Sequence, residues 1–211
     1  MFRNAVILMA ALWLGACSTV GSDTPLFAAA DTVGAPVLRP GLWAAPSRGC
    51  RFSSKADAAK WPDCANGVVV GASRLVGGRR DASGAFTEVL PFSLAAGDPP
   101  VMQIETPPGH DLRGPRFVYV GVRPLASDEV GEIVKARIWL ALCAPPVVAG
   151  APAPRPPKLP ARVIPSKDKS YCITRNKLAL RSMVRTSEGW AFQGTQDDYG
   201  LVAFWVRDEP R

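Results

Sequence analysis

The chain has 211 residues with 25 Lys and Arg against 18 Asp and Glu, a formal net charge of +7 at neutral pH. This length is enough for one domain with a sizeable hydrophobic core. Beyond the first residues no apolar stretch is long enough to cross a bilayer as a helix, which excludes a protein with several spanning helices. The basic balance favours anionic neighbours such as lipid headgroups, lipopolysaccharide phosphates or acidic polymers.

The N-terminal residues have the pattern of an export signal. Arg3 precedes an apolar run over residues 5–13, and small residues precede Cys17. A dozen apolar residues make about 18 Å of helix, too short for a hydrocarbon core of about 30 Å. Residues 14–17, which read Leu-Gly-Ala-Cys, resemble the lipobox of a bacterial lipoprotein signal peptide.

This resemblance implies removal of residues 1–16 and attachment of membrane lipid, including palmitate, to Cys17. Ser18 stands where an Asp would oppose onward transport, so the resemblance also implies the outer membrane, with the protein facing the periplasm. Stable anchoring requires more than one acyl chain, because each buried CH2 contributes only about 0.8 kcal/mol. Nucleic acid is not an expected partner there. The alternative is an ordinary cleaved signal that contains a cysteine by chance.

The other four cysteines predict two disulfides, because an even number in an oxidising compartment is typical of a bridged domain. Of the three connectivities we expect Cys50–Cys64 and Cys143–Cys172. The first bridge closes a loop that is poor in strand signals, which stabilises by about 3 kcal/mol in the chain-entropy model. The second brackets a proline-rich segment, contributes about 3.5 kcal/mol and ties a helix to a sheet edge.

In chain order, the composition of residues 17–38 predicts a flexible tether, and a single domain follows over residues 39–211. A strand over 68–76, a Gly-rich turn over 77–84 and a strand over 85–93 form a hairpin. Further strands are expected over 101–105, 117–122 and 133–143. The run 117–122 is apolar on both faces. The strand 133–143 alternates, with Trp139 on a partly solvated second face.

Seven prolines make residues 144–161 an extended, exposed insertion loop. Thr174 or Asn176 is expected to cap a helix over 177–188, which packs through three apolar residues, Leu180, Met183 and Val184. Three cations line another face of this helix at four-residue spacing: Lys177, Arg181 and Arg185. They form a possible contact face for anionic groups, or a solvated surface. A final strand is expected over 201–207.

The sum is a β-rich α+β domain with six to seven strands, mostly antiparallel. The strands form a small barrel or a sandwich, and one helix in the C-terminal half packs on it.

The inventory of catalytic residues is sparse. His110 beside Asp111 is the one histidine and the one candidate general base. A lone histidine does not make a metal site when the cysteines are committed to disulfides, so neither metal nor cofactor is expected. Five tryptophans downstream of the signal permit a sugar-binding platform, although core packing is the commoner use: Trp43, Trp61, Trp139, Trp190 and Trp205.

Three short motifs are similar to those of bacterial lipoproteins of alphaproteobacterial type: Gly41-Leu42-Trp43, Trp61-Pro62-Asp63-Cys64 and Tyr171-Cys172. The resemblance implies no activity and no functional residues. We therefore expect a lipid-anchored envelope protein with a non-enzymatic structural or binding role, partnered by another envelope protein or an anionic envelope component. The alternatives are an envelope-modifying hydrolase that uses His110, and a barrel that holds a small ligand.

Overall fold

The computed structural model describes residues 19–80, 86–106, 114–146, 157–167, 170–192 and 200–209, without the side chains of 78–80. These residues contain eleven strands, three short 3-10 helices and one α-helix, α2 (Lys177–Ala191). The strands are β1 (Thr19–Ser22), β2 (Gly41–Ala44), β3 (Val68–Val70), β4 (Arg74–Arg80), β5 (Phe86–Ala95), β6 (Val101–Glu105), β7 (Phe117–Ser127), β8 (Ile133–Leu140), β9 (Val163–Pro165), β10 (Tyr171–Thr174) and β11 (Gly200–Arg207).

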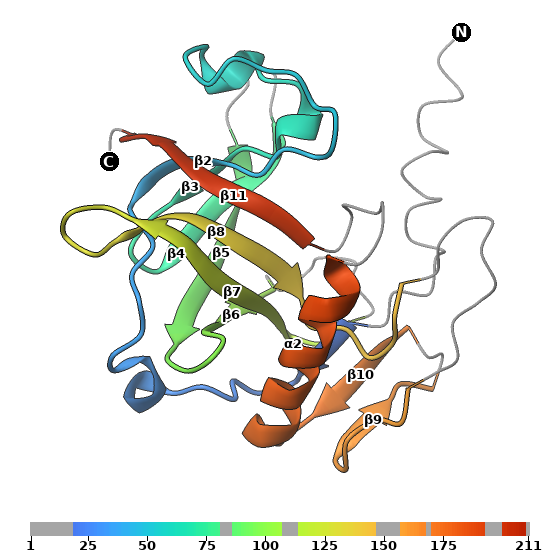
Figure 1. Cartoon of the computed structure of the whole chain (residues 1–211). Helices are drawn as coiled ribbons and strands as arrows, with labels where there is room; N and C mark the ends of the chain where they lie inside the picture. Colours follow the sequence, from blue (N-terminus) through green and yellow to red (C-terminus); the bar gives the residue numbers. More distant parts are fainter. Residues whose placement is uncertain are drawn as a thin grey trace, which may run out of the picture.

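Eight strands close into an antiparallel barrel in the order β6-β5-β4-β3-β2-β11-β8-β7, with β7 pairing back onto β6 (Figure 1). Strands β1, β10 and β9 extend this sheet outside the barrel, next to β7. The predicted β-rich domain with one helix and two disulfides is confirmed, and its form is a barrel. The prediction of six to seven strands is wrong, because three- and four-residue strands leave no periodicity to detect.

Alternation along the strands fills the barrel with side chains. The face of β8 predicted to be apolar points inward, where Ala136 and Ile138 meet Val122 of β7 and Ala203 of β11. Trp43 of β2 lies in the same cluster and is 2% exposed. An eight-stranded barrel has an interior that side chains can fill. The packed middle therefore argues against a small ligand enclosed there.

Helix α2 covers the outside of the barrel wall and corrects the prediction for Trp139. The indole of Trp139 is 1% exposed rather than partly solvated, and its Nε1 donates a 2.8 Å hydrogen bond to the carbonyl oxygen of Val184. Gly121 of β7 provides the space, because a Cβ there would lie 2.2 Å from the indole. The expectation that residues 117–122 are covered on both faces is confirmed, since Tyr119 on the helix side and Val122 on the barrel side are fully buried. The last four residues of β7 are exposed.

The predicted start and packing face of α2 are correct. Asn176 caps it by accepting a 2.9 Å hydrogen bond from the backbone nitrogen of Ala179. Leu180, Met183 and Val184 are buried against the barrel. The helix continues three residues beyond the predicted end at 188, through Ala191, which is also buried.

Residues 19–38 are part of the folded domain, which corrects the predicted tether. Val20 is fully buried in β1, and Phe27 is 4% exposed. The buried side chain of Gln103 holds the following segment, because its Oε1 accepts hydrogen bonds from the backbone nitrogens of Leu26 (2.8 Å) and Phe27 (3.0 Å). A partner some 76 residues away leaves no local pattern in the sequence, so this segment resembled a linker.

The predicted strand over 68–76 is two strands. β3 and β4 pair antiparallel around a tight turn in which the backbone nitrogen of Gly71 donates to the carbonyl oxygen of Arg74 at 2.8 Å. The region expected to be a turn from residue 77 is strand as far as Arg80. Strand β6 has the predicted bounds. The proline-rich loop is described only at its ends, 144–146 and 157–161.

Both disulfides have the predicted pairing. Cys50–Cys64 closes a loop whose Trp61 is 4% exposed and packs edge-on against Phe52, with ring centroids 4.8 Å apart. This loop covers the outer side of β2, where Leu42 is fully buried. The bridge therefore closes a small core of its own outside the barrel.

The contact between α2 and the barrel predicts the effect of Gly121→Ala. The added Cβ overlaps the Trp139 ring, so we expect a loss of about 1–3 kcal/mol of unfolding free energy in urea denaturation. In a Trp139→Phe background the same change should cost less, because the smaller ring leaves room. Val130→Ala on the exposed β7–β8 turn is the control and should stay within about 0.5 kcal/mol of wild type. Equal costs of Gly121→Ala in the two backgrounds would contradict this packing.

Candidate functional site

Three residues singled out from the sequence lie outside the described residues: Cys17, His110 and Asp111. Their geometry is therefore not part of the site. The first described residue, Thr19, follows Cys17 by two positions and already belongs to β1. The described part of the chain therefore begins in a strand, two residues after the predicted lipid attachment point.

β1 is held on both sides. It pairs parallel with β10, with Thr19 opposite Tyr171, and antiparallel with β7, with Gly21 opposite Val118. In addition, the backbone nitrogen of Val20 donates a 2.7 Å hydrogen bond to the carbonyl oxygen of Ala141, just after β8. Three elements therefore hold a strand of only four residues, and we call this arrangement the β1 seat.

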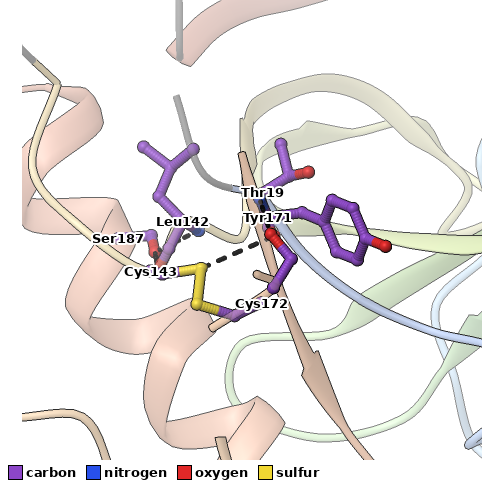
Figure 2. Close-up of a disulfide and its surroundings, with 7 residues drawn as sticks. Thr19, Leu142, Cys143, Tyr171, Cys172 and Ser187 are labelled. Atoms are coloured by element: carbon purple, nitrogen blue, oxygen red, sulfur yellow. Dashed lines mark hydrogen bonds between the residues drawn. A yellow bond between two sulfur atoms is a disulfide. The ribbon is translucent and has the colours of Figure 1, made fainter. Parts of the chain in front are cut away.

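The disulfide Cys143–Cys172 closes the β1 seat (Figure 2). It joins the chain after β8 to β10, and the Cys143 sulfur lies 3.5 Å from the carbonyl oxygen of Thr19. Ser187 of α2 is fully buried beside it, accepts from the backbone nitrogen of Leu142 at 2.8 Å and donates to the carbonyl oxygen of Met183 at 2.7 Å. The bridge and this hydroxyl bring β8, β10, α2 and β1 together at one point.

Lys177, Arg181 and Arg185 of α2 each contact an oxygen atom of another segment of the protein. Lys177 forms a 2.7 Å ion pair with Asp31, and the Arg185 Nε donates to the carbonyl oxygen of Asp98 at 2.9 Å. Arg181 donates to the carbonyl oxygen of Ala96. The predicted anionic contact face therefore attaches the helix to the chain around η1 (Ala29–Thr32) and to the β5–β6 turn.

Arg181 is the most deeply embedded of these cations. Its guanidinium carbon lies 5.0 Å from the centroid of the Phe27 ring, and burial lowers its pKa. Nη1 is buried and has no hydrogen-bond partner among the described residues. Gly97, with φ of +144°, leaves room for it, since a Cβ there would lie 2.2 Å from Nη1.

A second ion pair secures the other end of the helix. The Arg123 Nη2 of β7 donates to Glu188 at 2.8 Å, and its Nε donates to the second oxygen of the same carboxylate. Asp98 lies 3.3 Å from Nη1. The hydrogen bonds to Glu188 raise the pKa of Arg123. This two-pronged contact fixes the helix against β7.

A groove of about 1540 Å³ opens at the end of the barrel where β7 ends and β8 begins. Its walls are the start of β2, the β3–β4 turn, the β7–β8 turn and the chain after β11. Five carboxylates and two guanidiniums line it: Asp128, Glu129, Glu132, Asp208, Glu209, Arg39 and Arg74. No local pattern in the sequence predicts this groove, because only the fold brings residues near 39, 74, 130 and 208 together. The density of acids over 128–132 was the one local signal.

Arg39 organises one wall of the groove. Its guanidinium carbon lies 3.9 Å from the centroid of the Trp205 ring, and it pairs with Asp128 at 3.3 Å and Asp208 at 3.8 Å. By contrast, Glu129 and Glu132 have no ion-pair partner among the described residues, so their charges remain available to a ligand.

The tryptophans do not form a platform in the described part of the chain. Trp43, Trp61 and Trp139 are each at most 4% exposed, and Trp190 and Trp205 are partly buried against the two larger cores. The described tryptophan side chains therefore serve the core or, in Trp205, support Arg39.

No group of three His, Cys, Asp or Glu side chains within the described ranges could hold a metal ion. None of the described helices is long and apolar enough to span a bilayer. Comparison with known proteins finds no matching family model, no matching curated protein and no matching solved structure.

The ion pair between Asp31 and Lys177 predicts a pH-dependent contribution to stability. The hydrogen bond from Lys177, followed by that from the Ala28 backbone, lowers the pKa of Asp31 below its ordinary value of 3.8. A carboxylate with a depressed folded-state pKa stabilises above the unfolded value, and this contribution disappears as the pH falls through the folded-state pKa. Asp31→Asn should therefore destabilise at neutral pH and should have no effect well below pH 3.8.

Urea unfolding midpoints at both pH values measure this difference. Asp23→Asn is the control, because Asp23 is exposed and forms no described ion pair. A deficit of Asp31→Asn that stays constant between the two pH values would exclude a charge-dependent contact.

Proposed function

We propose that the protein is a lipid-anchored envelope protein, held through acylated Cys17 on the periplasmic side of the outer membrane, with a binding rather than a catalytic role. The observation that carries this proposal is the β1 seat, in which a strand only two residues after Cys17 is held by β7 and β10 and closed by a disulfide. Two disulfides suit an oxidising compartment.

The length of β7 indicates how the anchored protein would be oriented relative to the membrane. β7 begins at Phe117, opposite Ser22 of β1, and ends at Ser127, which lines the groove. Eleven residues at about 3.3 Å each separate these ends by about 33 Å. The β7–β8 turn and the β9–β10 hairpin accordingly lie on opposite sides of the molecule (Figure 1). A protein anchored at Cys17 would present its groove away from the bilayer.

The chemistry of the groove favours a polar ligand that carries an amino or other cationic group. Glu129 and Glu132 stand on the β7–β8 turn without ion-pair partners in the described part of the chain. In a molecule of net charge +7, a groove with five carboxylates and two arginines is a local reversal of sign. Such a reversal attracts cations that the rest of the surface repels.

Metabolic labelling with a clickable palmitate tests the anchor. The wild-type protein should be labelled and recovered in the outer membrane after density separation, whereas Cys17→Ser should lose the label. A Cys50→Ala/Cys64→Ala variant is the matched control, because it removes cysteines that form a disulfide and should keep the label. Equal labelling of wild type and Cys17→Ser would rule out the anchor.

A further inference from the structure

The β9–β10 hairpin has one buried side and one open side. Val163 of β9 and Cys172 and Thr174 of β10 are at most 6% exposed on the side that packs against the domain. Side chains alternate along a strand. Exposed Ile164 and half-buried Tyr171 and Ile173 therefore lie on a second surface, and exposed Arg162 and Arg175 stand directly beside the two strands in the chain. We call these five residues the β9–β10 face.

The β9–β10 face has an apolar centre. Ile164 is 66% exposed and lies opposite Ile173 in the strand register. Tyr171 adds an aromatic ring that points away from α2 and the disulfide (Figure 2). Leu178, at the start of α2 shortly after this hairpin, is 78% exposed. Tyrosine and branched apolar residues are the side chains that occupy the boundary between headgroups and acyl chains.

Several exposed cations lie near this centre in the chain. Lys158, Arg162, Lys167 and Arg175 are exposed and have no ion-pair partner among the described residues. Residues 157–178 contain one acid, Asp168, against six Lys and Arg, and Asp168 lies outside the described residues. Lys177 is the one of these cations with a described ion-pair partner. Arg162 also has a φ of +75°, a backbone conformation that is unfavourable for a side chain of this size.

We propose that the β9–β10 face docks on an anionic phospholipid surface, with Ile164, Ile173 and Tyr171 at the headgroup boundary and the nearby cations on lipid phosphates. Charge complementarity identifies the partner, because each basic residue near an anionic leaflet adds to binding and the basic residues of 157–178 outnumber the single acid, Asp168. The inference rests on the proposed lipid anchor for its setting, but the affinity of the face does not require an acyl chain.

The β1 seat places this face at the membrane. Thr19 is the register partner of Tyr171, so their Cα atoms are about 5 Å apart. Two residues of extended chain from Cys17 to Thr19 reach at most about 7 Å. A lipid on Cys17 therefore holds Tyr171 within about 12 Å of its attachment point, and the face meets the headgroups without any domain movement.

Vesicle sedimentation of the full chain carrying Cys17→Ser tests the face without acylation. The vesicles consist of phosphatidylcholine alone or of phosphatidylcholine with phosphatidylglycerol. We compare an Arg162→Gln/Ile164→Ser/Arg175→Gln variant with a control, Arg48→Gln/Arg51→Gln/Val89→Ser, which makes the same changes at exposed positions elsewhere. Residues 1–16 are present in every variant, so their contribution to binding cancels in the comparison.

We expect the unchanged face to prefer anionic vesicles, and the face variant to lose about fivefold in partitioning for each arginine removed. The control and a charge-conserving Arg162→Lys/Arg175→Lys variant should keep the preference. Equal partitioning of the face variant and the control, or no anionic preference in the unchanged face, would overturn the proposal. A failed palmitate label with intact vesicle binding would reject the anchor alone, and the reverse result would reject the face alone.

Discussion

The packing around the first described strand depends on the hydrogen bonding of β1 between β7 and β10. A four-residue strand buries too little surface to hold itself in place, and each net hydrogen bond contributes only about 1 kcal/mol. The Cys143–Cys172 bridge and Ser187 compensate by fixing the two neighbouring elements and the helix behind them. Because α2 is in turn packed on Trp139, the barrel wall, the helix and the first strand support one another.

The described side chains at the two ends of the molecule differ in charge. Acidic side chains gather at the groove beside the end of β7, and cations without a described ion-pair partner gather around the β9–β10 hairpin, on the other side of the molecule (Figure 1). The net charge of +7 conceals this separation. The sequence shows a basic pattern on α2, but these cations attach the helix to the rest of the domain. The charge of the two ends therefore comes from other residues.

The features that could be predicted are those with a local signal or a strong chemical constraint. The disulfide pairing is predicted by the two segments that each cysteine pair brackets. Asn176 predicts the start of α2, and an apolar run bounded by prolines predicts β6. The seat of β1 could not be predicted, because its partners at Val118, Ala141 and Tyr171 are 97 or more residues away. The groove required the same long-range assembly. The sequence does not predict the burial of Trp139, because α2, which covers it, lies 38 residues or more along the chain.

Hydrogen–deuterium exchange of the β1 amides tests the central claim most directly. If β1 is part of the folded domain, the Val20 amide, which donates to Ala141, opens only with global unfolding, and its exchange should be as slow as that of core amides in β7. Reduction of the disulfides should speed exchange in β1 before it affects β7. Exchange of residues 19–22 at the rate of an unstructured peptide in the oxidised protein would contradict the account, because β1 would then be a tether.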